Sequence, residues 1–131
     1  MPKPNPASPF QRRNKYRVAP KALRTDANGK VYASKAEMLY AAQLRLMGVP
    51  FTEQPRIKLG DTGIVYVPDF YVHAGGVPEY VDVKGVQTAA FRIKKKLWKL
   101  YGPDTLRIVK RDHGRFVTVE IVPKGTKADC A

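Results

Sequence analysis

The chain has 131 residues and a net charge of +13, from 24 Lys and Arg against 11 Asp and Glu. This is the size of one domain, and the excess of positive charge suits a polyanionic partner, although ribosomal, membrane-surface and histone-like proteins share it. The single cysteine, Cys130, excludes a disulfide framework and favours a reducing compartment, so we expect a cytoplasmic protein. No segment has the apolar length of a membrane span or the pattern of a secretory signal, so we expect neither membrane insertion nor secretion.

The N-terminal segment differs in composition from the rest. Residues 1–24 contain seven basic residues, five prolines and no acid, which predicts a flexible or loosely docked basic arm. Arg12, Arg13 and Lys15 are its candidate contacts to nucleic acid. Residues 25–123 are predicted to form one folded domain, and residues 124–131 to form a frayed C-terminal tail.

The predicted elements follow in chain order. A turn at residues 26–29 precedes a helix from Ser34 to about residue 47, which Gly48 ends. Residues 51–59 predict an edge or bulged strand, because a proline interrupts them. A hairpin of residues 64–72 and 78–84 comes next.

The second half continues with a helix over residues 88–101. Two alternating strands, 106–110 and 115–122, are joined by a turn at 112–114. The order α-β-β-β-α-β-β predicts a single α/β domain with a central mixed β-sheet flanked by helices.

The acids of the hairpin carry the functional signal. If Gly75 and Gly76 form a two-residue turn, the register places Asp69 directly opposite Asp82. Opposed residues share a face and residues two apart share a face, so Asp69, Asp82 and Lys84 should cluster on one side. Facing carboxylates repel unless a cation lies between them, and Mg²⁺ is the usual occupant of such sparse oxygen sites. The other face is apolar and is expected to face the core: Phe70, Val72, Val81 and Val83.

Glu37 is a third acid of interest, with two interpretations open. Residues 34–37 match a capping box, in which Glu37 satisfies a backbone donor. Glu37 also heads the apolar helix face of Tyr40, Ala41 and Leu44, from which its carboxylate could reach the hairpin acids.

Structural interpretations stay open for the hairpin residues as well. Asp69 could be a turn residue after a proline, and Asp82 with Lys84 could be a solvent-facing cross-strand pair. Gln54 is a candidate neighbour of the site. Three further residues are expected to be incidental: His73, His113 and Cys130.

An acid on a helix, then Pro-Asp, then acid-x-Lys on the next strand resembles the PD-(D/E)xK nuclease superfamily. The similarity covers about residues 30–100 and is closest to small junction-resolving endonucleases of tailed phages and to a phage family known only as a domain of unknown function. One departure is Asp82, where many relatives carry Glu. The matching segments are Tyr32-Ala33-Ser34, Gly48-Val49-Pro50-Phe51, Gln54-Pro55, Pro68-Asp69-Phe70, Asp82-Val83-Lys84-Gly85 and residues 88–96.

The resemblance implies a restriction-endonuclease-like fold and a metal-dependent endonuclease. It implies that Asp69, Asp82 and the Val83 carbonyl bind Mg²⁺, for which Mn²⁺ would substitute, with Glu37 completing or supporting the shell. It also implies that Lys84 orients the attacking water and stabilises developing charge.

The second predicted helix, residues 88–101, is expected to contact DNA. No acid lies on this helix, although a merely solvated charged face is the open alternative. Several phosphate contacts would make binding steeply salt-dependent and largely independent of sequence. The candidate contacts are Arg92, Lys94, Lys95, Lys96 and Lys99.

The same helix should also carry a buried stripe. Ile93, Leu97 and Leu100 recur at helical spacing and are expected to face the sheet. Phe91 and Trp98 are expected in the core rather than as stacking platforms for bases.

We therefore expect a Mg²⁺-dependent DNA endonuclease, encoded by a phage and acting on branched or Holliday-junction DNA in the host cytoplasm. Paired incisions across a junction require two active sites, so a homodimer is expected. Two alternatives stay open: a repair or restriction-type nickase on the same fold, and a non-catalytic nucleic-acid-binding protein that has retained the scaffold.

Overall fold

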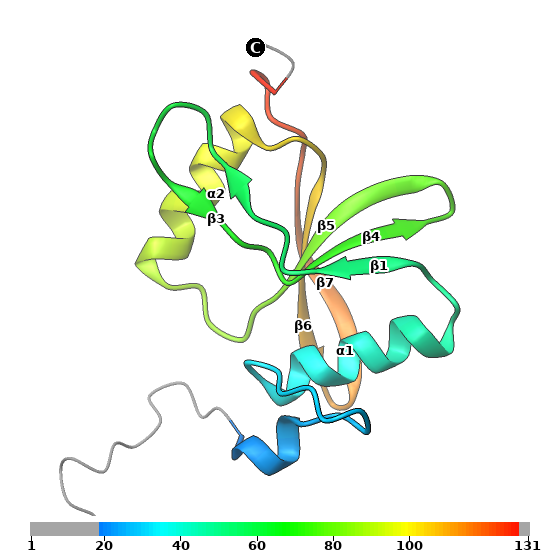
Figure 1. The fold of residues 1–131 in the computed structure, drawn as a ribbon. Helices are drawn as coiled ribbons and strands as arrows, with labels where there is room; N and C mark the ends of the chain where they lie inside the picture. Colours follow the sequence, from blue (N-terminus) through cyan, green and yellow to red (C-terminus); the bar gives the residue numbers. More distant parts are fainter. Residues whose placement is uncertain (1–18, 129–131) are drawn as a thin grey trace, which may run out of the picture. The chain divides into compact units, whose positions relative to one another are not determined.

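The computed structural model describes residues 19–128. The described residues divide into two compact units, one ending at Met38 and the other beginning at Leu39, which we describe separately (Figure 1). The predicted contacts Arg12, Arg13 and Lys15 lie outside the described residues. In the described part of the chain, no helix has both the length and the apolar character needed to cross a membrane.

The first unit is organised around a tight turn. The Asp26 carboxylate accepts the N–H groups of Asn28 and Lys30, each at 2.9 Å, and Thr25 bridges to Val31 across the turn. This confirms the turn predicted at residues 26–29. A 3₁₀-helix, η1 (Lys21–Arg24), precedes it, so the end of the predicted flexible arm is ordered.

Helix α1 (Lys35–Leu46) begins and ends as predicted. The Ser34 hydroxyl accepts the Glu37 N–H at 3.1 Å, which is the N-cap bond of the predicted capping box. At the other end Gly48 adopts the left-handed conformation, with a φ of 69° that glycine tolerates at a helix C-terminus.

The second unit is built on a five-stranded sheet in the order β1-β4-β5-β6-β7. Strands β5 and β6 run parallel and the other neighbours run antiparallel, which confirms the predicted central mixed sheet. Helix α2 (Ala89–Tyr101) forms the crossover that a parallel pair requires. The strands are β1 (Phe51–Glu53), β4 (Phe70–Ala74), β5 (Val77–Val83), β6 (Leu106–Asp112) and β7 (Arg115–Val122).

Two predicted strands are each broken in two. Segment 51–59 divides into the edge strand β1 and β2 (Ile57–Lys58), because Gln54 has a φ of 53° and a proline follows it. Segment 64–72 divides at Pro68 into β3 (Val65–Tyr66) and β4. Strands β2 and β3 pair as a separate two-stranded sheet. The order is therefore α-β-β-β-β-β-α-β-β, and the predicted order with three strands between the helices was wrong.

The β4–β5 hairpin has the predicted register. Phe70 pairs with Val81, and the pairing continues to the turn at Gly75 and Gly76, whose φ values are 59° and 77°. Positive φ at both turn residues is the type I′ geometry that suits the twist of a hairpin. Asp69 lies one residue before the first pair, on the position that faces Asp82.

Both faces of the sheet are covered. On one face, Phe70 of β4 contacts Tyr40 of α1 and Phe51 of β1, with ring centroids 5.4 and 5.6 Å apart. Val72 and Val81 are buried as expected, whereas Val83 is only half-buried. The other face carries the larger apolar cluster, which includes Leu59, Tyr66, Tyr80, Phe91, Trp98, Leu106, Ile108 and Val122.

Helix α2 buries only part of the predicted stripe, because Leu97 is half-buried and packs against the core whereas its two companions do not. Phe91 and Trp98 are in the core, as expected, but Ile93 is 55% exposed and Leu100 is 37% exposed. The two aromatic side chains lie one heptad apart and fill the space over the sheet, and the Trp98 indole donates to the Asp104 carbonyl at 2.9 Å. With these two aromatic side chains facing the sheet, Ile93 and Leu100 face outward.

The described part of the C-terminal tail is docked, not frayed. The N–H groups of Gly125, Thr126 and Lys127 donate to the carbonyls of Gly102, Lys99 and Leu100, respectively. Because the last carbonyls of a helix have no partner within it, residues 125–127 cap the C-terminal end of α2.

This capping depends on the absence of a side chain at Gly125. A Cβ there would lie 2.5 Å from the backbone of Leu100 and Tyr101, whereas a Cβ at Gly85 would meet nothing within 4 Å. We expect Gly125→Ala to lower the free energy of unfolding by about 1–3 kcal/mol through overpacking. Gly85→Ala, the matched control, should change it by less than about 0.5 kcal/mol. Urea denaturation of both variants measures the difference, and equal stabilities would contradict the proposed docking.

Candidate active site

Asp82 is a buried carboxylate in the middle of the fold. It lies in β5 opposite Ile108 of β6, on the sheet face that α2 covers, and is 2% exposed. A buried charge is costly unless it is hydrogen-bonded or paired. The Tyr66 hydroxyl donates to Asp82 Oδ2, and the Lys84 ammonium lies 3.6 Å from the same oxygen. The Asp82 carboxylate is therefore held by one neutral donor and one cation.

Asp69 is fixed by the backbone of β5. The N–H groups of Tyr80 and Lys84 donate to the carbonyls of Thr105 and Val109, so even-numbered residues of β5 point their N–H groups toward β6. The Val83 N–H therefore points toward β4, whose pairing with β5 begins only at Phe70. Asp69 Oδ2 accepts this N–H at 2.7 Å and takes the place of a strand carbonyl.

The same geometry orients the Val83 carbonyl. In an antiparallel pair the N–H and C=O of one residue point to the same neighbouring strand. The Val83 carbonyl is thus directed to the side of β5 on which Asp69 lies. A carboxylate and a backbone carbonyl are placed side by side at the end of the strand.

Both hairpin acids act on one hydroxyl group. Burial raises the pKa of Tyr66 far above its ordinary value, and the charge and hydrogen bond of Asp82 and the charge of Asp69 raise it further. Because Phe70 pairs with Val81 and side chains alternate along a strand, Asp69 and Asp82 lie together on the other face of the hairpin. The register thus places both acids on the predicted face, and the raised pKa keeps Tyr66 a protonated donor.

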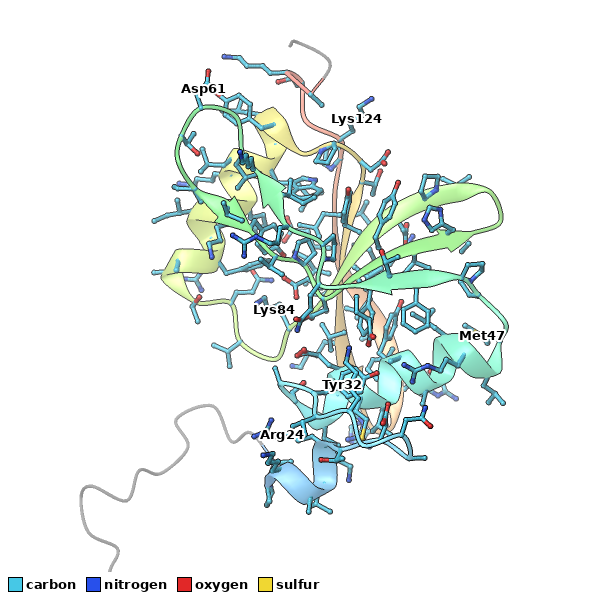
Figure 2. The ribbon with its side chains drawn as sticks, in the orientation of Figure 1. Arg24, Tyr32, Met47, Asp61, Lys84 and Lys124 are labelled. Carbon is cyan, nitrogen blue, oxygen red and sulfur yellow. The ribbon has the colours of Figure 1, made fainter. Side chains whose placement is uncertain are left out.

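Lys84 follows the last residue of β5. Its ammonium lies 4.7 Å from the ring centroid of Phe91 at the start of α2, and its side chain is 31% exposed. Figure 2 shows Lys84 near the point where the central strands converge. The lysine is thus at the boundary between the buried carboxylate and solvent.

Glu37 and Gln54 have distinct positions. Glu37 is in the first turn of α1, in the first unit, and is buried. Its role as a supporting metal ligand remains a prediction. Gln54 adjoins Asp69 directly, because its N–H donates to the Asp69 carbonyl at 2.9 Å while its backbone is in the left-handed region. A non-glycine residue held in that region is often found at a functional site.

Tyr66 is the site residue that the sequence analysis missed. It appeared to belong to one continuous apolar strand, in which nothing distinguishes a hydroxyl-bearing aromatic residue from a core residue. The one feature of the sequence that could have indicated Tyr66 is its position three residues before Asp69, on the other side of Pro68. The chain must break at that proline for Tyr66 to turn back over Asp82.

The oxygen atoms at this site suit a hard divalent cation. Asp69, Asp82 and the Val83 carbonyl supply the type of ligand that Mg²⁺ and Mn²⁺ prefer. Within residues 19–128, no group of three or more His, Cys, Asp or Glu side chains is placed to hold a metal. An ion held by these residues would need water molecules as its remaining ligands, as Mg²⁺ often has.

The basic residues of α2 are not equivalent. Arg92, Lys96 and Lys99 are exposed on the outer side of the helix, while Lys94 is half-buried. Lys95 is engaged within the protein: its ammonium lies 2.7 Å from Glu120 Oε1 of β7. No acid lies on the helix itself, but Lys95 is nevertheless paired, because its partner comes from a distant strand.

Comparison with known proteins gives one match. A family model described as "Protein of unknown function (DUF1064)" matches residues 13–112. No curated protein and no solved structure matches the chain.

The bond between Tyr66 and Asp82 predicts a specific alkaline response. The native pKa of Tyr66 is above that of an unfolded tyrosine, so above pH 10 the unfolded chain binds fewer protons than the native one. The contribution of Tyr66 to the free energy of unfolding is then fully present below pH 10 and decreases as the pH rises above it. We expect Tyr66→Phe to reduce this fall by about 1.4 kcal/mol per pH unit. Urea denaturation between pH 9 and 11 in EDTA measures both slopes, and parallel slopes would show that Tyr66 is not held protonated.

Proposed function

The chain belongs to the family of proteins of unknown function DUF1064, and we propose that it is a metal-dependent DNA endonuclease of the PD-(D/E)xK type. The observation that carries this proposal is the grouping at the end of β5, where Lys84 lies 3.6 Å from Asp82 and Asp69 accepts the N–H of the intervening Val83. A protein of net charge +13 that only bound nucleic acid would gain nothing from collecting acids at one point.

The proposed ligands are Asp69, Asp82 and the Val83 carbonyl, with Glu37 as a supporting acid. A bound Mg²⁺ would neutralise the scissile phosphate and lower the pKa of a water ligand. The protein's own residues then have separate tasks. Tyr66 holds one oxygen of Asp82 and leaves the other available, and Asp69 is fixed by the Val83 N–H. Lys84 places a positive charge where the phosphate gains negative charge during hydrolysis.

DNA binding is supported by the surface of α2. Arg92, Lys96 and Lys99 recur at spacings of four and three residues on the exposed side of the helix, which starts next to Lys84. Contacts from such a row would bind the phosphate backbone without reading sequence.

The finer parts of the proposal rest on the resemblance to phage junction-resolving enzymes. They are a branched or Holliday-junction substrate, a homodimer that makes paired incisions, and action in the host cytoplasm. Cleavage of a four-way junction, compared with cleavage of a linear duplex of equal length, tests the substrate.

One observation favours a second candidate, a non-catalytic DNA-binding protein on the same scaffold. Asp82 is almost fully buried and hydrogen-bonded to Tyr66, an arrangement that could serve packing alone. The two candidates differ in whether the acids are needed for cleavage or only for stability.

Nicking of supercoiled plasmid in Mg²⁺ separates them. We expect Asp82→Asn and Lys84→Met each to reduce nicking at least 100-fold, because the first removes a ligand and the second removes a charge while keeping the side-chain stem over Phe91. Asp82→Asn should bind DNA at least as tightly as wild type, since it removes a repelling charge.

The matched control is Asp61→Asn, which makes the same charge change at an exposed residue of the β2–β3 loop, away from Lys84 (Figure 2). It should nick like wild type. Wild-type protein that binds DNA without metal-dependent nicking, or an Asp82→Asn variant that nicks normally, would rule out the nuclease in favour of the binding protein.

Substitution of two lysines of α2 tests whether this helix contacts DNA. Lys99 is exposed and Lys95 is paired with Glu120, so we expect Lys99→Ala to lower the salt slope of DNA binding by about 0.9. Lys95→Ala should leave that slope unchanged and lower stability by up to about 1 kcal/mol. Fluorescence anisotropy at several salt concentrations gives both slopes; a larger effect at Lys95 would exclude this assignment.

A further inference from the structure

The β6–β7 hairpin continues past the end of β5. Strand β5 pairs with β6 only as far as Val83 and Val109, whereas β6 and β7 remain paired through Asp112 and Arg115. The hairpin closes at His113 and Gly114, which both have positive φ. Residues 110–117 therefore form a two-stranded ribbon that extends beyond β5, at the end of the strand where Lys84 lies.

One side of this ribbon continues the face of the active site. Asp82 pairs with Ile108, so Lys110, two residues further along β6, lies on the same face as Asp82. Arg115 pairs with Asp112, which is two residues beyond Lys110 and so also on this face. Starting from the site, the face thus presents Lys84, then Lys110, then Arg115.

The opposite side of the ribbon is covered. Phe116 pairs with Arg111 and its ring centroid is 5.0 Å from that of Tyr40 in α1. Helix α1 thus supports the ribbon from behind. The face that carries Lys110 and Arg115 is turned away from this contact and is exposed.

The exposed charged residues of the ribbon are predominantly basic. Lys110, Arg111 and Arg115 are exposed, and no carboxylate of residues 19–128 forms an ion pair with them. The one acid there, Asp112, is 2.8 Å from His113 Nδ1. Unbalanced cations next to a phosphodiester-cleaving site favour a polyanionic partner, and the β-ribbon is a shape that DNA grooves admit.

We propose that the ribbon of residues 110–117 is a second DNA-binding element, in which Lys110 and Arg115 contact the phosphate backbone of duplex DNA beside the scissile phosphate. This rests on the proposed nuclease function and adds to it. Helix α2 and the ribbon lie on different sides of the end of β5 (Figure 1), so the duplex is held on both sides of Lys84. From the sequence, only the α2 side was predicted to contact DNA.

The test uses the cleavage-deficient Asp82→Asn protein in EDTA and a fluorescently labelled linear duplex. Adding Lys110→Ala with Arg115→Ala should lower the salt slope of binding by about 1.8, because two phosphate contacts are lost. The matched control adds Arg56→Ala with Lys58→Ala, which removes the same charge from exposed residues at β2. The control pair should leave the slope unchanged. Circular dichroism and melting temperature verify that all variants are folded.

The outcomes separate the two proposals. An equal decrease in slope for both double variants, or no decrease for Lys110 and Arg115, overturns the ribbon as a contact and leaves the nuclease proposal standing. A parent protein with no affinity for the duplex overturns both. A slope reduced selectively by Lys110→Ala with Arg115→Ala, together with plasmid nicking by the wild-type protein in Mg²⁺, supports both.

Discussion

The fold is arranged around one costly interaction, a carboxylate placed inside an apolar core. Asp82 lies among the aromatic side chains that α2 and the sheet bury between them. Such a group persists only when its hydrogen bonds are satisfied. Tyr66 provides that bond, and the break at Pro68 frees β3 from β4 so that Tyr66 can reach it. The small β2–β3 sheet therefore positions Tyr66 for its hydrogen bond to Asp82.

The hairpin was predictable because its determinants are local. Gly75 and Gly76 fix the turn, and the period of two then fixes which residues share a face with Asp69 and Asp82. The helix starts at Ser34 and Thr88 were predictable for the same reason, since each caps its own first turn. The division of segment 64–72 was not, because it depends on pairing with β2.

Helix α2 shows where sequence periodicity stops being sufficient. It has two apolar stripes, one with Phe91 and Trp98 and the other with Ile93 and Leu100, and either could face the sheet. The size of the aromatic residues and the Trp98 bond to Asp104 decide between them. The partner of Lys95 was equally hidden, because Glu120 is 25 residues away and is brought close only by β7.

The central claim is that Asp69, Asp82 and the Val83 carbonyl form the ligand set for one divalent cation. The most direct measurement is an anomalous difference map from crystals of the protein grown with Mn²⁺. The account predicts a peak within coordination distance of both carboxylates and the carbonyl, and no such peak in Asp82→Asn. An ordered site without a peak in the wild-type protein, or a peak bound only by other residues, would contradict it.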